Sequence, residues 1–127
     1  MNRILITSGP TREYLDPVRY LSNGSSGRMG AALAEAVLQQ GEMPVLVSGP
    51  ATVSYPQKAD VHWVETTDQM LQCCLKLVPQ CAGVIGAAAP CDFRPVALSE
   101  QKIAKPKDGS GMTLRLVETP DILAALG

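Results

Sequence analysis

Near its start the chain reads Arg3-Ile4-Leu5-Ile6-Thr7-Ser8, a short apolar run that ends at Gly9-Pro10. A continuous apolar run of this length, without alternation of polar and apolar residues, is typical of a strand that is covered on both faces. Such strands occur mainly in parallel sheets, because helices cover both sides of those sheets. This opening stretch therefore predicts an α/β fold built on a parallel sheet.

Helical patterns follow this strand in two places. Apolar residues recur at three- and four-residue intervals from near Ser26, and Gly41 stands where a helix would end. Thr66 and Gln69 have the spacing of a capping box, and the apolar stripe behind them ends at Pro79. We expect a helix in each place, and a final one opened by Thr119-Pro120-Asp121.

Strand patterns separate these helices. Strands are expected over residues 43–48, 61–65, 83–88 and 112–117, and long loops over 9–25 and 89–111. Strands that alternate with helices through right-handed crossovers give a Rossmann-like, open and mostly parallel sheet. The sequence thus predicts a three-layer α/β/α architecture, with ligands beyond the carboxyl ends of the strands.

Composition limits the classes of function. The chain has 127 residues, 46% of them hydrophobic and 18% charged, which is enough for one core and predicts a single domain over residues 1–127. A net charge of -1, with one Trp, three Tyr and one Phe, argues against nucleic-acid binding. Neither a membrane-length apolar run nor a signal peptide is present, so we expect a cytoplasmic protein. Four cysteines without a C-x-x-C pair, and one histidine, give little support for a zinc site.

The stretch Ser22-Asn23-Gly24-Ser25-Ser26-Gly27-Arg28-Met29-Gly30 is the first candidate site. Hydroxyls and free amides at a helix N-terminus suit a phosphate or a carboxylate, although an ordinary capped turn has the same composition. The glycines are spaced G-x-x-G-x-x-G and lie far from the first strand, and Ser48-Gly49 stands where a ribose-binding acid would be. The dinucleotide fingerprint is therefore not met, and an NADP-binding module is the lesser hypothesis.

A second candidate site combines Asp92 with three lysines, Lys102, Lys105 and Lys107. Lysines in a glycine-containing loop suit a polyphosphate, but a solvated surface loop has the same pattern. Asp92 follows the small residues 87–89, which would let a planar group approach the backbone. Its carboxylate could accept hydrogen bonds from a ribose or a base, or orient a metal.

Three motifs in the chain resemble the phosphopantothenate–cysteine ligase (phosphopantothenoylcysteine synthetase) family. These are residues 4–13 (ILITSGPTRE), residues 16–30 (DPVRYLSNGSSGRMG) and Pro120-Asp121-Ile122. The resemblance covers nearly the whole chain. In bacteria this ligase is the second activity of the bifunctional coenzyme A flavoprotein.

The resemblance implies a two-step reaction with CTP as co-substrate and Mg²⁺ as its companion, and without flavin. CTP would convert the carboxylate of 4′-phosphopantothenate into an acyl-cytidylate, and the amine of cysteine would then displace CMP. Residue types alone leave ATP open in place of CTP. The resemblance also implies a homodimer.

The same resemblance assigns roles to particular positions. Asn23, Arg19 and Lys102 would take part in catalysis, with Lys102 also on the nucleotide, and Ser25, Ser26 and Gly27 would bind the substrate. No residue is assigned as a metal ligand. The remaining nucleotide-binding positions would be Gly86, Ala87, Ala88, Asp92, Pro120, Asp121, Ile122 and Leu123.

The chain departs from the family pattern in several places. Lys102-Ile103-Ala104-Lys105 replaces K-x-K-K, so Lys107 would have to compensate for a missing cation. Pro90-Cys91 and Thr119 replace small aliphatic residues and an asparagine. The family domain continues with further strands, and a flavin-dependent decarboxylase precedes it, so we expect a C-terminally truncated ligase domain. A nucleotide-binding fragment that needs a partner chain is the alternative.

Overall fold

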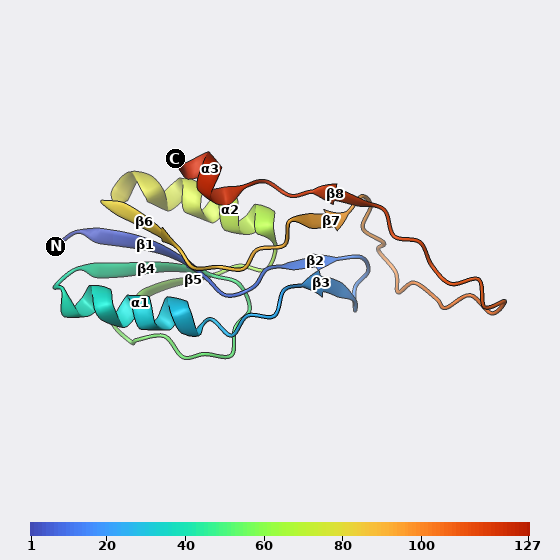
Figure 1. Ribbon diagram of the computed structural model, residues 1–127, viewed down its shortest axis with the longest axis horizontal. Helices are drawn as coiled ribbons and strands as arrows, with labels where there is room; N and C mark the ends of the chain where they lie inside the picture. The colour runs from blue at the N-terminus through green and yellow to red at the C-terminus, as the bar shows by residue number, and fades with distance from the viewer.

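A four-stranded parallel sheet forms the centre of the computed structural model, which describes residues 1–127 (Figure 1). Its strands are β1 (Arg3–Ser8), β4 (Met43–Ser48), β5 (Asp60–Trp63) and β6 (Gly83–Gly86), in the order β5-β4-β1-β6. The register between β1 and β4 runs from Arg3 opposite Met43 to Ser8 opposite Ser48. The predicted Rossmann-like fold is confirmed.

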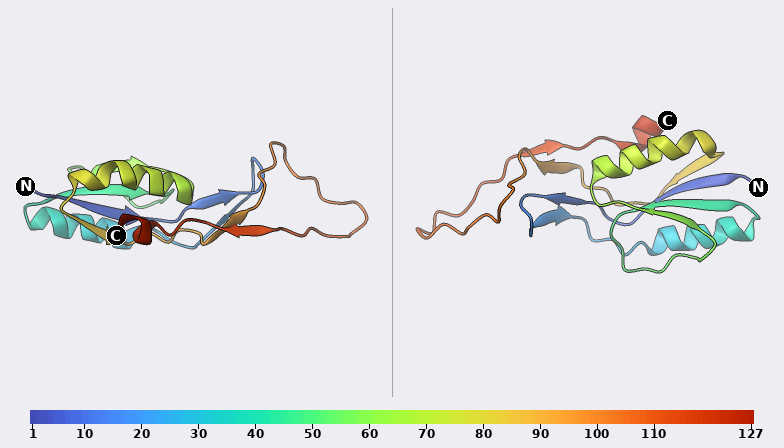
Figure 2. Two further views of the ribbon diagram at one scale, coloured as in Figure 1. Left: turned by 90° about the horizontal axis from the view of Figure 1, so that it is seen from above. Right: turned by 180° about the vertical axis from the view of Figure 1, so that it is seen from behind.

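Helices cover both faces of this sheet, as Figure 2 shows. Helix α1 (Arg28–Gln39) lies on one face, and α2 (Thr67–Leu77) lies on the other and continues into the 3₁₀ turn η1 (Val78–Gln80). The short helix α3 (Ile122–Leu126) packs beside α2. No helix combines the length and the apolar character needed to cross a membrane.

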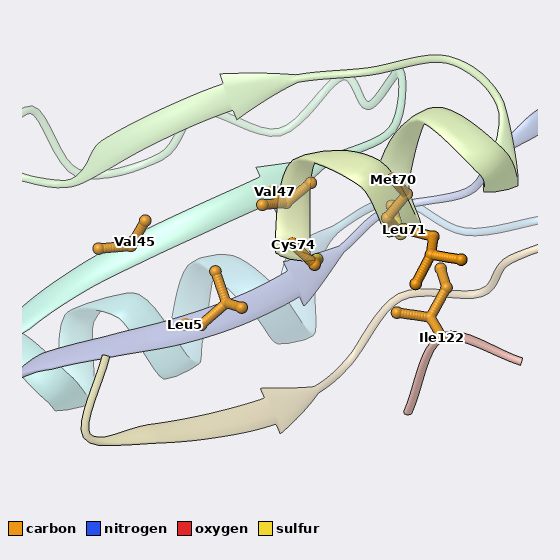
Figure 3. Packing of buried hydrophobic residues seen from close by; sticks show 7 residues of the cluster. All are labelled: Leu5, Val45, Val47, Met70, Leu71, Cys74 and Ile122. Carbon is orange, nitrogen blue, oxygen red and sulfur yellow. The ribbon is translucent and has the colours of Figure 1, made fainter. Parts of the chain in front are cut away.

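Each face of the sheet has its own apolar core, because successive side chains of a strand point to opposite faces. Ile6 and Leu46 pack against Ala34 and Val37 of α1. The larger core, shown in Figure 3, lies under α2 and consists of Leu5, Val45, Val47, Met70, Leu71, Cys74 and Ile122. The three-layer arrangement predicted from the sequence is thus present.

Helix α1 has the predicted position, and Leu33 and Val37 of the predicted apolar face pack in the core, but the rest of that face does not. The sequence pattern runs through Met29, Ala32, Leu33, Ala36 and Val37, yet Met29 is 64% exposed and both alanines face solvent. The residues that are buried are Gly30, Ala34 and Val37. Gly30 and Ala34 let the helix lie close to the sheet, and an apolar pattern underweights small residues of this kind.

Two short antiparallel ladders extend from the sheet and were not predicted. Strands β2 (Arg12–Tyr14) and β3 (Tyr20–Ser22) pair within the expected loop 9–25. Strand β7 (Phe93–Pro95) pairs with β8 (Leu116–Glu118). The strand expected over 112–117 was therefore wrong in its bounds, since only its last two residues belong to β8. Residues 96–115 form a long loop that leads away from the sheet (Figure 1).

The strand order determines where a ligand would bind. From β1 the chain moves to β4 and β5 on one side, whereas β6 lies on the other side of β1. Connections that diverge in this way leave a crevice at the carboxyl ends of the two neighbouring strands where the strand order reverses, here β1 and the edge strand β6.

Candidate functional site

A cavity of about 460 Å³ lies at this switch point. Thr7 at the end of β1 and Gly86 at the end of β6 contribute to its wall. Residues 90–93 and 118–123 complete it. The cavity collects most of the positions assigned to the nucleotide, namely Gly86, Ala88, Asp92, Pro120, Asp121, Ile122 and Leu123.

The small residues at the end of β6 make room for this cavity. A Cβ atom built on Gly86 would lie 2.8 Å from Cδ1 of Leu123 and 2.9 Å from Cδ2, so a side chain there would displace Leu123. Ala88 lies on the same side of the sheet as Ile122, whereas Ala87 packs with the core under α1. The side chain of Ala87 therefore does not line the cavity, and its amide donates to the carbonyl of Thr7 at 3.0 Å.

The charge in the cavity is negative. Asp92, Glu118 and Asp121 line it, and no lysine or arginine does. The Asp121 carboxylate already accepts the Ala124 amide at 3.1 Å, where it caps α3. Asp92 is exposed, and its one hydrogen bond within the chain is made by its backbone carbonyl, which accepts the Thr119 amide. The carboxylates of Asp92 and Glu118 accept no hydrogen bond within the chain, and that of Asp92, at a predicted nucleotide position, suits hydroxyl or amine donors.

Asn23 lies against the loop that forms one wall of this cavity. Its Nδ2 donates to the carbonyl of Pro90 at 3.0 Å and to that of Ala89 at 3.3 Å. Both hydrogens of the amide are therefore directed at the loop, and Oδ1 is left as an acceptor. The structure brings Asn23 to the edge of the nucleotide positions, although more than 60 residues separate them in the sequence.

The N-terminus of α1 is held by the first strands and by the segment 51–55. Gly27 is the N-cap with φ 81°, and a Cβ there would lie 2.8 Å from Val53 Cγ1. A Cβ at Gly30 would lie 2.0 Å from Ser8 Oγ, so the first turn lies directly on the end of β1. Ser26 Oγ accepts the Arg28 amide at 3.3 Å, and no acidic residue stands in the first turn. This end of the helix thus carries uncompensated positive charge suited to an anion.

Arg19 lies in an ion pair with a buried acid. Its guanidinium lies 3.3 Å from the fully buried Asp16 carboxylate and donates to the Ile103 carbonyl at 2.8 Å. Asp16 also accepts the amides of Ile103, Val18 and Arg19. Burial alone would raise the pKa of Asp16, but these amides and the Arg19 charge outweigh it and hold the pKa below its usual value. Together they attach the loop at Ile103, next to Lys102.

The three lysines lie on the projecting loop. Lys102, Lys105 and Lys107 are exposed, and none lines the cavity. Lys102 is beside the attachment point at Ile103, whereas Lys105 and Lys107 lie farther along the loop. The cluster therefore does not meet the nucleotide positions in this arrangement of the chain.

Sequence reasoning missed a group of buried polar side chains behind the cavity wall. Thr11, Thr67 and Cys91 are joined by hydrogen bonds, and Glu13 accepts the Thr67 amide at 2.9 Å. The one signal was the capping box at Thr66, which the structure confirms and which places Thr67 at the start of α2. Nothing local indicated that Thr67 meets residues 11 and 91.

The donor set gives no separate metal site. No group of three or more His, Cys, Asp or Glu side chains has the geometry to hold a metal ion. Any Mg²⁺ would therefore take most of its ligands from phosphate oxygens and water, which is how Mg²⁺ commonly binds with nucleotides.

Comparison with protein families matches residues 1–127 to the DNA/pantothenate metabolism flavoprotein C-terminal domain. The coenzyme A biosynthesis bifunctional protein CoaBC of Vibrio vulnificus (strain YJ016) is 42% identical over 123 residues, 97% of this chain and 31% of the relative. CoaBC of Bacillus subtilis (strain 168) is 43% identical over 125 residues, 98% of this chain and 30% of the relative. The chain thus spans about a third of the length of the curated relatives it matches.

Solved structures agree with this match. The C-terminal domain of a CoaBC protein superposes with a TM-score of 0.84 at 38% identity, over 99% of this chain and 58% of that one. A variant of Cab2, solved as a complex with phosphopantothenate-cysteine, superposes with a TM-score of 0.80 at 20% identity, over 98% of this chain and 59% of that one. The second likeness concerns the fold.

Proposed function

This chain belongs to the family of the DNA/pantothenate metabolism flavoprotein C-terminal domain, and we propose on that basis that it acts as a phosphopantothenate–cysteine ligase in coenzyme A biosynthesis. CTP activates the carboxylate of 4′-phosphopantothenate with release of pyrophosphate, and the amine of cysteine then displaces CMP from the acyl-cytidylate. One observation carries the proposal. The positions 86, 88, 92 and 120–123, which lie in separate parts of the chain, line a single cavity at the switch point.

The charge of the cavity orients the nucleotide. Three acidic residues, Asp92, Glu118 and Asp121, would repel a triphosphate, so the cavity receives the base and the ribose. The free acceptors of Asp92 suit a ribose hydroxyl or the exocyclic amine of cytosine. The phosphates then point out of the cavity toward Asn23 and the N-terminus of α1.

The substrate positions surround that exit. Ser25, Ser26 and Gly27 at the start of α1 bind an anionic group through amides and hydroxyls, as helix N-termini do. Asn23 fixes the acyl oxygen by exchanging one of its two bonds to the loop carbonyls. The bond to Ala89 is the longer at 3.3 Å and is the one given up. Stabilisation of a developing oxyanion by a positioned donor is a large term in acyl transfer.

Arg19 and the lysines act at the other side of the nucleotide. Arg19 holds the root of the projecting loop through the Ile103 carbonyl, next to Lys102. Lys102 neutralises phosphate charge when the loop bends over the nucleotide, and Lys107 takes the place of the missing family lysine. Mg²⁺, when bound with CTP, supplies further charge neutralisation.

A homodimer is the proposed assembly. Apolar side chains are exposed in the turn that joins β2 to β3 and in the loop that joins β7 to β8, where a monomer would leave them in water. Val18 is 59% exposed, Val96 52% and Leu98 65%. Burial of such residues against a second copy would stabilise the ladders, which have few contacts with the sheet.

The test is a turnover assay of the chain with CTP, Mg²⁺, 4′-phosphopantothenate and cysteine, in which pyrophosphate and the amide product are both measured. Native protein is expected to form both in equal amounts. Asp92→Asn is expected to lower the CTP affinity about tenfold through loss of a charge-assisted hydrogen bond. Glu35→Gln, which neutralises an exposed acid of α1 outside the cavity, is the control. Pyrophosphate release that needs neither 4′-phosphopantothenate nor an intact Asp92 would contradict the proposal.

A further inference from the structure

The residue before Asp92 is held by a closed ring of hydrogen bonds behind the cavity wall. The Cys91 amide donates to Thr11 Oγ1 at 2.8 Å. Thr11 Oγ1 and Thr67 Oγ1 lie 2.8 Å apart, and Thr67 Oγ1 donates to the Cys91 carbonyl at 3.3 Å. The ring therefore starts and ends on the same residue.

The direction of every bond in the ring is determined. A threonine hydroxyl has one proton, and that of Thr67 is given to the Cys91 carbonyl. Thr11 must therefore donate to Thr67, while its own oxygen accepts the Cys91 amide. Each hydroxyl accepts one bond and donates one, so no polar group in the ring is left over. Thr11 and Thr67 are both fully buried, which makes an unpaired hydroxyl or peptide group costly there.

Two more contacts connect the ring to the opposite wall of the cavity. Thr119 Oγ1 also donates to the Cys91 carbonyl, and the Thr119 amide donates to the Asp92 carbonyl at 2.9 Å. The walls 90–93 and 118–123 are thus joined at Cys91. Two of the places where the chain departs from the family pattern, residues 90–91 and residue 119, meet at this point.

We propose that Thr67 is a positioning residue, whose hydroxyl closes the ring through Thr11 and so keeps Cys91 and Asp92 in the arrangement that accepts the nucleotide. The nucleotide part of this statement rests on the proposed function. Thr67 lies at the start of α2, and its amide is separately held by Glu13 Oε1 at 2.9 Å. A Thr67→Val substitution therefore removes the hydroxyl, while shape and the attachment of the helix are kept.

The thiol of Cys91 reports on the loop without any nucleotide. It is 7% exposed and lies 3.6 Å from the Thr11 carbonyl, and burial raises its pKa, so iodoacetamide reacts with it slowly while the ring is closed. Cys74 lies in the core under α2, where burial raises its pKa to about 12. Its alkylation needs the core to open. The ratio of the two rates separates local loosening of the loop from unfolding of the domain.

The experiment measures iodoacetamide modification of each cysteine by peptide mass spectrometry in the native chain and its variants. Thr67→Val is expected to raise the Cys91 rate about tenfold with the Cys74 rate unchanged, as loss of a buried hydrogen bond predicts. Thr67→Ser keeps the hydroxyl and is expected to restore the native rate within about twofold. Thr52→Val is the control at an exposed threonine. Thr11→Val removes the other hydroxyl of the ring, which lies outside α2. It is the variant to measure if Thr67→Val fails to fold.

The same proteins are titrated with CTP and Mg²⁺. Thr67→Val is expected to weaken binding about tenfold, as loss of a buried hydrogen bond predicts, with Thr67→Ser close to native. Three outcomes would each overturn the positioning role. The Cys91 rate could stay unchanged in Thr67→Val, the Cys91 and Cys74 rates could rise equally, or Thr67→Ser could fail to restore the native rate. If the cysteines of native protein react as expected but the protein binds no CTP, the proposed function fails. The alkylation rates of the variants then still test the positioning role of Thr67.

Discussion

Asn23 Nδ2 donates to the carbonyl of Pro90 at 3.0 Å. This bond joins the segment before α1 to the loop after β6, and so joins the proposed acyl site to the proposed nucleotide cavity. Because its second hydrogen is directed at Ala89, Asn23 has a structural role in the loop in addition to any role in chemistry. Substitution of Asn23 is therefore expected to affect both steps, to different extents.

Asn23→Ala is expected to lower amide formation by about 10²- to 10³-fold, the effect of losing a donor to a developing oxyanion. CTP affinity is expected to fall only about five- to tenfold, because two loop hydrogen bonds are lost from an exposed side chain. Product formation and CTP titration measure the two effects. Gln57→Ala, which removes an exposed amide elsewhere, is the control. Equal losses in both measurements would contradict the acyl role.

Gly86→Ala is expected to weaken CTP binding at least tenfold. The new methyl would lie within 3 Å of both Leu123 methyl groups, so Leu123, which lines the cavity, must move and the wall changes shape. Gly83→Ala in the same strand is the matched control, since its nearest neighbour, Ile4 Cδ1, is 4.0 Å away. Adding Leu123→Ala to Gly86→Ala should recover part of the affinity. A Gly86→Ala protein that binds as tightly as Gly83→Ala would place the nucleotide elsewhere.

Asp16→Asn is expected to make stability less dependent on acid pH. The folded-state pKa of Asp16 lies below the ordinary value of 3.8, because three amides and Arg19 outweigh the effect of burial. A carboxyl with a lowered pKa stabilises the fold fully above 3.8, and this contribution is lost as the pH falls through the folded-state value. We therefore expect native protein to have a higher free energy of unfolding than Asp16→Asn at pH 7 and pH 5, and a smaller difference at pH 3. Denaturant unfolding at the three pH values measures this difference. Glu35→Gln, which changes an exposed acid of α1, is the control. A difference in the free energy of unfolding that does not depend on pH would contradict a lowered pKa of Asp16.

Lys102→Ala is expected to lower CTP affinity roughly three- to tenfold and turnover with it, through loss of a cation near the phosphates. The difference from native protein should narrow as the salt concentration rises, because the side chain is exposed and screened. Affinity measured at two ionic strengths tests this. Lys58→Ala is the control at an exposed lysine outside the loop. No change in affinity at low salt would mean that the projecting loop does not reach the nucleotide.

The elements that could be predicted are those whose own residues form a recognisable pattern, such as an apolar run or a capping box. The apolar runs of β1 and β4 and the capping box at Thr66 gave these elements nearly correct bounds. Strands β2 and β7 were missed because each has three residues and exists only through a partner elsewhere in the chain. The same holds for the site. The motifs indicated the cavity positions, whereas the ring through Thr11, Thr67 and Cys91 depends on tertiary contacts alone.

The most direct test of the account is an isothermal titration of the chain with CTP and Mg²⁺, repeated with ATP and with NADPH, each with and without 4′-phosphopantothenate. We expect CTP to bind in preference to NADPH and 4′-phosphopantothenate to strengthen the binding of CTP. Gly86→Ala is expected to weaken CTP binding at least tenfold, while Gly83→Ala keeps it. Binding of NADPH alone, or CTP binding that Gly86→Ala leaves intact, would contradict a cytidine nucleotide site at the switch point between β1 and β6.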